Sequence, residues 1–307
     1  FMQKNKISYH FFYNFVALTY KIMKKIAFIS FIALLFVACG SQTKEQGDTI
    51  FVTIPPLQQL VSEITCGDFT IEILVTEGAS PESFEPTSQQ IAKLNDAELV
   101  FSTGLINFEQ SLISHIKDSE RVVNLSEGIE LIAGSCSHHH HHHHHSHGID
   151  PHIWTSPRAL GIMVKNIETA LRTSYPDSTK YFEAAERVAA RINALDKSCS
   201  KMLSESQTKA IMIYHPAYTY LARDYSVEQI TIEQEGKEPS PRQLTTLVQE
   251  ACAEGIKSIL IQPQYNIKKV MPIAKECGAE VVVTDPLAAN IFGEIARVTE
   301  IICRSNE

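Results

Sequence analysis

The 307-residue sequence lacks the short motifs that mark several large enzyme classes. It has no G-x-G-x-x-G loop, no Walker phosphate-binding loop and no G-x-S-x-G nucleophile turn. The zinc-hydrolase motif H-E-x-x-H is absent too, and no two cysteines have the C-x-x-C spacing of a thiolate metal site. These absences argue against dinucleotide-dependent enzymes, serine hydrolases and cysteine-based zinc modules.

An excess of basic charge is also missing. The chain has 27 Lys and Arg against 35 Asp and Glu, which gives a net charge of -8. This balance argues against nucleic acid as a partner and suits a surface that attracts cations. The hydrophobic content of 44% and the charged content of 20% are those of a soluble globular protein.

The amino-terminal segment has the pattern of an export signal. Lys24 and Lys25 precede the apolar run 26–37, which is too short to span a bilayer and is followed by small residues. Cys39 stands where a bacterial lipoprotein signal places its lipidated cysteine, although Phe36 replaces the usual Leu. An ordinary cleaved signal peptide is the alternative interpretation.

Met23 is the expected translation start, with the preceding residues an over-extended reading frame. Residues 1–38 are therefore expected to be this extension and a lipoprotein signal peptide, and 39–47 a tether. The expected location is outside the cytoplasm, either periplasmic or anchored to a membrane by lipid on Cys39.

Six cysteines follow Cys39 in the sequence: Cys66, Cys136, Cys199, Cys252, Cys277 and Cys303. An exported protein can oxidise some of them. The last three fall in successive expected helices, so a Cys252–Cys303 bridge is one candidate, and the sequence leaves the connectivity open.

Strand patterns alternate with helix patterns along the chain, which implies parallel sheets covered by helices. The expected strands are 48–54, 69–75, 98–102, 121–125, 209–214, 228–233, 258–262 and 280–284. Segment 177–206 has no Gly or Pro and is rich in good helix formers, so one long helix of roughly 40 Å is expected there. The predicted fold is two α/β lobes, 48–176 and 207–307, each with a roughly four-stranded parallel sheet, joined by that helix.

A histidine tract interrupts the first lobe in the expected loop 137–149. Its members, nine of the chain's thirteen histidines, are His138, His139, His140, His141, His142, His143, His144, His145 and His147. Imidazole binds zinc, copper, iron and nickel well, so the tract is interpreted as an accessory metal-capturing segment. An affinity tag would be expected at a terminus rather than in the middle of the chain.

Four side chains near expected strand ends are candidate ligands of one metal ion: Glu82, His152, His215 and Asp285. Ligands of parallel α/β sheets bind beyond the carboxyl ends of the strands, and each lobe supplies two of these residues. The metal is therefore expected in the cleft between the lobes. Two imidazoles and two carboxylates suit four-coordinate zinc, and manganese and iron accept the same set.

Six short sequence motifs are shared with one protein family. They are PESFEPT at 81–87, AELVFSTG at 97–104, DPHIW at 150–154, YHPAYTYLARDY at 214–225, EGKEPSPRQ at 235–243 and DPL at 285–287. Together they make the chain resemble the cluster A-I substrate-binding lipoproteins of bacterial ABC transporters for zinc and manganese. The resemblance spans nearly the whole chain after Cys39, and it implies two α/β lobes joined by one long helix.

The resemblance also implies that Glu82, His152, His215 and Asp285 are the metal ligands, and that a histidine-rich loop marks zinc members. Glu82 is a departure, because the family usually has His there, and a carboxylate is a harder ligand that weakens a preference for zinc over manganese. Glu82 is expected to ligate, and the alternatives are a tract imidazole or a water that Glu82 orients.

Two further expectations concern residues around the site. Glu235, Glu238 and Arg242 are expected in loop and cap roles, with a carboxylate that holds a ligand imidazole as the alternative. Trp154 is expected to pack beside the site.

The function implied by the resemblance is capture of Zn2+ outside the membrane and its delivery to an ABC permease driven by a cytoplasmic ATPase. The protein is expected to be a monomer and no enzyme, with Mn2+ or Fe2+ as alternative transported ions. A zinc-dependent hydrolase is less favoured, because a catalytic zinc needs an open coordination position and a general base. A metal-dependent adhesin, or a zinc buffer without a transporter, is the third class.

Overall fold

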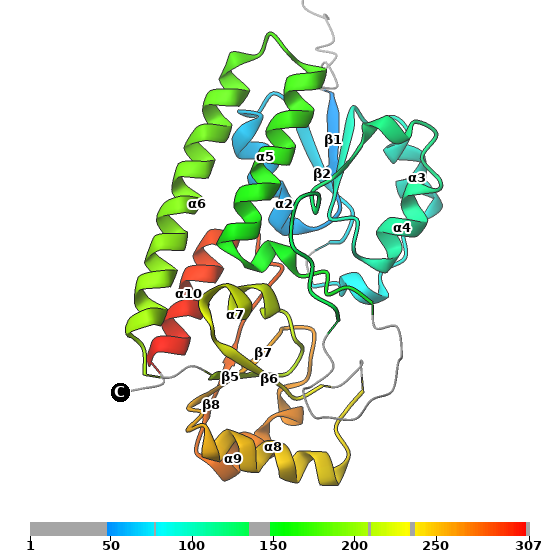
Figure 1. Ribbon diagram of the computed structural model, residues 1–307. Helices are drawn as coiled ribbons and strands as arrows, with labels where there is room; N and C mark the ends of the chain where they lie inside the picture. Colours follow the sequence, from blue (N-terminus) through cyan, green and yellow to red (C-terminus); the bar gives the residue numbers. More distant parts are fainter. Residues whose placement is uncertain (1–47, 77, 135–147, 208–209, 234–236, 305–307) are drawn as a thin grey trace, which may run out of the picture. The chain divides into compact units, whose positions relative to one another are not determined.

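The computed structural model describes residues 48–76, 78–134, 148–207, 210–233 and 237–304 (Figure 1). The expected signal and tether with Cys39, and the histidine tract with Cys136, lie outside the described residues. Within the described part of the chain, no helix is both long and apolar enough to cross a membrane.

The N-terminal half contains a four-stranded parallel sheet with the strand order β2-β1-β3-β4. Its elements are β1 (Thr49–Val52), α2 (Pro55–Ile64), β2 (Thr70–Ile73), η1 (Pro81–Ser83), α3 (Ser88–Leu94), β3 (Leu99–Ser102), α4 (Asn107–Ile113), η2 (Ser119–Arg121), β4 (Val122–Asn124), η3 (Ile153–Thr155) and α5 (Pro157–Ser174). The predicted strands are all present, each shortened at one or both ends.

The C-terminal half repeats this arrangement with the order β6-β5-β7-β8. After α6 (Thr179–Glu205) come β5 (Ala210–Ile213), α7 (Thr219–Tyr225), β6 (Glu228–Thr231), α8 (Pro241–Ala253), β7 (Ser258–Ile261), η4 (Ile267–Lys269), α9 (Met271–Cys277), β8 (Glu280–Val283) and α10 (Ile291–Arg304). In each sheet the chain order reverses beside the first strand, which is where α/β proteins bind ligands. The predicted fold class is confirmed.

Local sequence explains where the helices around the site begin. Pro55 and Pro56 occupy the first turn of α2, where their missing N–H groups cost nothing. Thr87 caps α3 in a reciprocal capping box with Gln90, as expected of a Thr followed three residues later by Gln. Ser156 caps α5 by accepting hydrogen bonds from the backbone N–H groups of residues 158 and 159.

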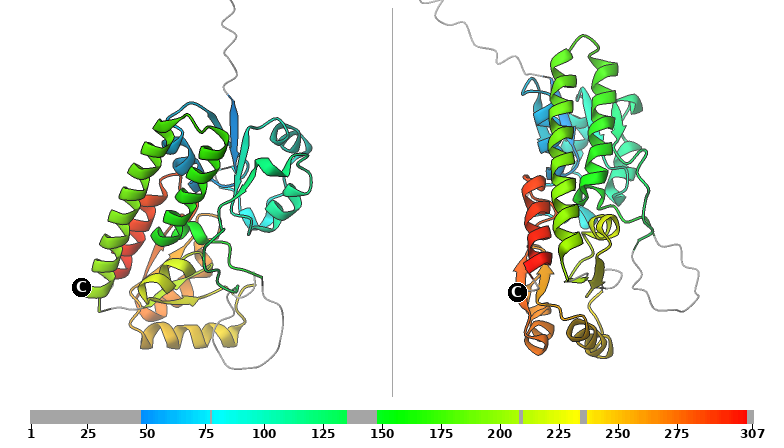
Figure 2. Two further views of the ribbon diagram at one scale, coloured as in Figure 1. Left: turned by 45° about the horizontal axis from the view of Figure 1, so that its top comes forward. Right: turned by 60° about the vertical axis from the view of Figure 1, so that its left-hand side comes forward.

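The predicted long helix is α6, whose 27 residues give a length of about 40 Å. One face of the helix is buried, and its buried members are Tyr181, Ala184, Ala185, Val188, Ile192, Cys199 and Leu203. This face packs against α5, α10 and α2, and Figures 1 and 2 show α6 running alongside α5 and α10. The helix thus connects the two sheets and forms part of the core between them.

The C-terminal sheet is buried on both faces. Ile211 and Ile213 of β5 join the larger core, together with residues of the N-terminal half, α7 and α10. Ala210 and Met212, which alternate with them, belong to a smaller core that α8 and α9 cover. The two central strands β5 and β7 are therefore almost continuously apolar, as expected for a parallel sheet with helices on both sides.

Candidate metal centre

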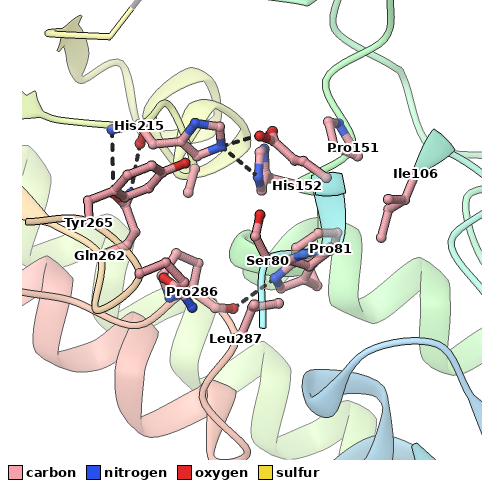
Figure 3. Close-up of a pocket in the computed structure, with 14 residues that line it drawn as sticks. Ser80, Pro81, Ile106, Pro151, His152, His215, Gln262, Tyr265, Pro286 and Leu287 are labelled. Atoms are coloured by element: carbon pink, nitrogen blue, oxygen red, sulfur yellow. Dashed lines mark hydrogen bonds and ion pairs between the residues drawn. The ribbon is translucent and has the colours of Figure 1, made fainter. Parts of the chain in front are cut away.

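Three predicted ligands meet between the two sheets: Glu82, His152 and His215. One donor atom from each lies within 4.8 Å of the other two. His215 Nε2 is 3.1 Å from Glu82 Oε1 and 3.4 Å from His152 Nε2 (Figure 3). Tetrahedral zinc, with bonds of about 2.0–2.1 Å, holds neighbouring donors about 3.3–3.4 Å apart. The separation of the two imidazole nitrogens matches an edge of such a shell, and the separation of His215 from Glu82 is slightly shorter.

Glu82 comes from the 3-10 turn η1, between β2 and α3. Phe84, two residues later, packs edge-on against Phe108 at a centroid distance of 5.0 Å, which fixes this turn on the N-terminal half. The Glu82 side chain is 45% exposed, against 13% for His215. Glu82 is therefore the donor that meets solvent and the one that can leave most easily.

His152 stands just after the segment that contains the histidine tract. An antiparallel bridge between Ala133 and Ile149 closes that segment, and Asp150 follows it directly. Asp150 Oδ1 accepts hydrogen bonds from the backbone N–H of His152 at 2.9 Å and from its Nδ1 at 2.8 Å. Because Asp150 holds the proton on Nδ1, the lone pair on Nε2 faces the other donors.

His215 follows β5 and is held in the same way. Gln262, at the end of β7, donates to the backbone carbonyl of His215 at 2.8 Å. Glu233, at the end of β6, accepts from His215 Nδ1 at 3.1 Å, and the Tyr265 ring stacks on the imidazole at 5.8 Å. Both imidazoles thus direct Nε2 into the site, each held by a buried carboxylate.

Sequence analysis did not identify these two carboxylates. The Asp-x-His spacing is a signal for Asp150, whereas Glu233 lies 18 residues from its imidazole and gives none. Glu238 does not hold a ligand imidazole but forms an ion pair with Lys269 at 3.0 Å, and Glu235 lies outside the described residues. Ser240 caps α8, in line with the expected cap chemistry of this stretch.

The charges of the site are strongly coupled. Burial disfavours a charged imidazole at His215, but hydrogen bonds to Glu233 and Glu82 outweigh it and raise the pKa to about 9. Burial also opposes ionisation of Glu82, yet its hydrogen bond to His215 lowers the pKa of that carboxyl below the ordinary value. The pKa of Asp150 is lowered because the interactions with His152 outweigh burial. The pair formed by Glu82 and His215 is therefore ionic near neutral pH.

Asp285 follows β8 but lies outside the group of three donors that meet among the described residues. Its backbone N–H donates to Glu294 Oε1 at 2.8 Å, and its Oδ1 accepts from the Leu287 N–H at 3.0 Å. The next two residues, Pro286 and Leu287, line the pocket at the site (Figure 3). Its role as a fourth ligand stays a prediction.

The pocket beside the donors has a volume of about 40 Å³. A single water needs about 10–15 Å³ on this measure, so the space suits one ion with a little water. Trp154 forms part of its wall and donates from Nε1 to the Pro286 carbonyl at 2.8 Å, which ties the two halves together here. The expected packing role of Trp154 beside the site is confirmed.

The candidate disulfide is wrong. Cys252 lies against Cys277, with the two Sγ atoms 2.7 Å apart, and not against Cys303. Cys303 is on α10, which packs along α6. The order of the helices in sequence could not reveal that the last helix leaves the face covered by α8 and α9.

Comparison with known proteins gives a consistent set of matches. Residues 50–294 match the family described as zinc-uptake complex component A, periplasmic, or ZnuA. The high-affinity zinc uptake system protein ZnuA of Bacillus subtilis is 31% identical over 271 residues, which are 83% of this chain and 85% of that protein. The zinc-binding lipoprotein AdcA of Streptococcus pneumoniae is 28% identical over 278 residues, 86% of this chain. The chain covers 56% of that AdcA, about half its length.

Solved structures agree with this result. A crystal structure of ZnuA superposes with a TM-score of 0.77 at 28% identity, over 85% of this chain and 100% of that one. A ZnuA deletion mutant crystallised with zinc bound gives a TM-score of 0.76 at 28% identity, over 85% of this chain and 98% of that one.

Proposed function

Because the chain belongs to the ZnuA family of periplasmic zinc-uptake components, we propose that it captures Zn2+ outside the cytoplasm and delivers it to an ABC permease driven by an ATPase. The observation that carries the proposal is the cluster of Glu82, His152 and His215 at zinc-like separations. Two imidazole nitrogens favour zinc over harder cations. The carboxylates on both Nδ1 atoms raise the basicity of these ligands.

Metal binding joins the two halves of the molecule. Glu82 and His152 belong to the N-terminal half, whereas His215 follows the first strand of the C-terminal sheet. In the metal-free protein the Glu82 carboxylate pairs with a protonated His215, and Zn2+ replaces that proton and bonds to both groups. Moving the halves apart by an ångström or two breaks this shell, which gives the permease a means to release the ion.

The fourth coordination position is assigned to Asp285 in this proposal. The assignment is supported by sequence position, because Asp285 immediately precedes Pro286 and Leu287 of the pocket wall, and it requires the carboxylate to turn toward the ion. Such a rotation gives up the hydrogen bond from the Leu287 N–H. If Asp285→Asn leaves zinc affinity unchanged, Asp285 is not the fourth ligand. The fourth position then belongs to an imidazole of the histidine tract or to a water molecule.

The decisive experiment is a competition titration with Zn2+ and a chromophoric chelator on the purified protein. We expect one tight site that survives deletion of residues 138–147 and is lost in His152→Ala and His215→Ala. His115→Ala is the matched control, because His115 is exposed at the end of α4 and its Nδ1 lies 2.8 Å from the Ser111 carbonyl oxygen. Loss of all tight binding on tract deletion would contradict the cleft site.

Glu82 gives the manganese and iron alternative a specific test. The same titration with Mn2+ or Fe2+ as competitor shows whether the carboxylate has changed the preferred metal. Glu82→His should then tighten Zn2+ relative to Mn2+. If the wild-type site holds Mn2+ or Fe2+ more tightly than Zn2+, that metal replaces zinc as the proposed transported ion.

The remaining parts of the proposal concern location and partners. Family membership supports export and the permease and ATPase partners. The signal pattern around Cys39 supports a lipid on that residue. A monomeric state remains part of the proposal. A binding protein rather than a hydrolase is supported by family membership. Incorporation of a labelled fatty acid in wild type and its absence in Cys39→Ser would test the anchor.

A further inference from the structure

Two cysteines on the outer side of the C-terminal sheet lie in direct contact. Cys252 is in the last turn of α8, and Cys277 is the last residue of α9. Their Sγ atoms are 2.7 Å apart, and the Cys277 thiol also donates to the Val248 carbonyl at 3.4 Å. A disulfide bond is about 2.05 Å long, so bond formation needs the sulfurs to approach by only about 0.7 Å.

The backbone holds the two thiols in this position. α8 and α9 pack against each other, and both are followed by a glycine in the left-handed region, Gly255 at φ +64° and Gly278 at φ +63°. Each glycine ends its helix and turns the chain into the next strand, β7 or β8. The two helix ends are thus fixed by the same local geometry, and the cysteines meet without any change of fold.

We propose that Cys252 and Cys277 form a disulfide by exchange with a disulfide-bearing oxidant of the exported compartment. Cys252 is exposed and attacks the oxidant, which releases one thiol and leaves a mixed disulfide on Cys252. Cys277 then attacks the Cys252 sulfur and releases the second thiol. Two cysteine thiols are oxidised and one external disulfide is reduced to two thiols, so atoms and electrons balance.

The order of these steps follows from exposure and charge. Burial, with a contribution from the neighbouring Cys252, raises the pKa of the Cys277 thiol to about 11. Cys277 therefore remains a thiol until the mixed disulfide has formed next to it. The inference uses the proposed function only for the location, because an oxidising compartment supplies the oxidant.

The cross-link would stabilise the smaller of the two hydrophobic cores. α8 and α9 cover the smaller hydrophobic core, whereas the larger one extends over the N-terminal half, α7 and α10. A bond between residues 252 and 277 closes a loop that contains β7 and restricts the unfolded chain. Both cysteines precede strands, so they lie at the opposite edge of the sheet from His215, which follows a strand. Metal affinity is therefore expected to stay unchanged.

The test treats the full-chain protein with oxidised glutathione, blocks remaining thiols, digests with trypsin and maps the peptides by mass spectrometry. We expect a peptide containing Cys252 joined to one containing Cys277, with the loss of two hydrogen atoms. The midpoint of thermal unfolding of the oxidised protein should exceed that of the reduced protein by roughly 5–10 °C. Cys252→Ser and Cys277→Ser should abolish both effects.

Cys66→Ser is the matched control, because Cys66 is another exposed cysteine and its removal should leave the cross-link intact. The inference would be overturned by any of three results. These are a stable glutathione adduct on Cys252, a peptide that joins Cys252 to Cys303, and equal unfolding midpoints of the oxidised and reduced protein. Zn2+ titration of the same samples separates the two proposals. Zinc binding without the cross-link defeats only the disulfide, and a cross-link without zinc binding defeats only the proposed function.

Discussion

Two buried carboxylates decide which nitrogen of each imidazole faces the proposed metal site. Asp150 and Glu233 each accept a hydrogen bond from an Nδ1 atom, so His152 and His215 present Nε2 to the ion. Without such a partner an imidazole populates both tautomers and rotates more freely, and part of the binding energy is spent on ordering it.

Glu233→Gln should therefore weaken zinc binding by roughly 10–100-fold, the range for loss of a carboxylate that holds a metal-bound histidine. The dissociation constant from competition titration measures the effect. Glu228→Gln is the control, because Glu228 begins the same strand β6 but is exposed. Equal affinities of the two variants would show that Glu233 has no role in metal binding.

The raised pKa of His215 predicts a pH dependence of zinc binding. With a pKa of about 9, the metal-free site holds a proton at neutral pH, and zinc must displace it. Apparent affinity should rise about 10-fold per pH unit from roughly pH 6.5 to 8.5 and level off above about pH 9. Calorimetry in buffers of different ionisation enthalpy should detect about one released proton per zinc at pH 7.

The stability of the metal-free protein should change in the opposite direction. A folded-state pKa raised above the model value of 6.5 means that the folded protein binds the proton more tightly than the unfolded chain. This contribution is complete below about pH 6.5 and is lost as the pH rises through about 9. The unfolding midpoint in chelator should fall over that window, and His215→Gln should flatten the fall.

The sequence identified the candidate ligands His152 and His215, but it did not identify the carboxylates that accept hydrogen bonds from their Nδ1 atoms. His152 and His215 stand in recognisable phrases near strand ends, so their convergence followed from the topology of parallel sheets. Glu233 reaches His215 only because β5 and β6 are neighbours in register, and nothing in the sequence distinguishes it from Glu235 or Glu238. Contacts between adjacent strands depend on register, which composition does not determine.

At the scale of elements, helix α7 connects the site to the base of the segment that contains the histidine tract. The Tyr220 hydroxyl donates to the Asp150 carbonyl at 2.8 Å and accepts from the Ile132 N–H at 3.2 Å. Arg223 donates to the Glu130 carbonyl at 2.6 Å. Since α7 begins four residues after His215, these bonds fix both ligand histidines relative to each other.

Tyr220→Phe should weaken zinc binding several-fold, because two buried backbone groups lose their partner and Asp150 is less firmly placed. Tyr225→Phe is a control on the same helix. It removes a hydrogen bond to Asp196 of α6 and should lower stability by about 1 kcal/mol without changing zinc affinity. A parallel loss of affinity in both variants would reduce the role of Tyr220 to general stability.

Element boundaries show what local sequence determines. The starts of α3, α5 and α8 are capped by Thr87, Ser156 and Ser240, each of which bonds to a backbone N–H within the next three residues. The helical stretch after Asn266 is divided into η4 and α9, with Pro272 in the first turn of α9. Helix ends in tight connections depend on tertiary packing. The helix α3 ends at Leu94, with Asn95 as its C-cap, a few residues before β3 begins.

At the scale of the whole molecule, Glu82, His152 and His215 come from both halves, so zinc bound at the proposed site would cross-link them and stabilise the fold. At a free concentration 100 times the dissociation constant, zinc should add about 2.7 kcal/mol to the free energy of unfolding. This corresponds to a rise in the unfolding midpoint of roughly 5–10 °C. Differential scanning calorimetry of wild type and His215→Ala checks it, and an equal rise in the variant would place the stabilising ion elsewhere.

Trp154 is the only tryptophan in the chain. Its ring lies 5.3 Å from the His152 ring, and its indole N–H is bonded across to Pro286. The tryptophan emission of the native protein therefore originates from one buried indole at the junction of the two halves. Ion arrival and departure can be timed by stopped-flow fluorimetry without any attached dye, and no second indole dilutes the signal.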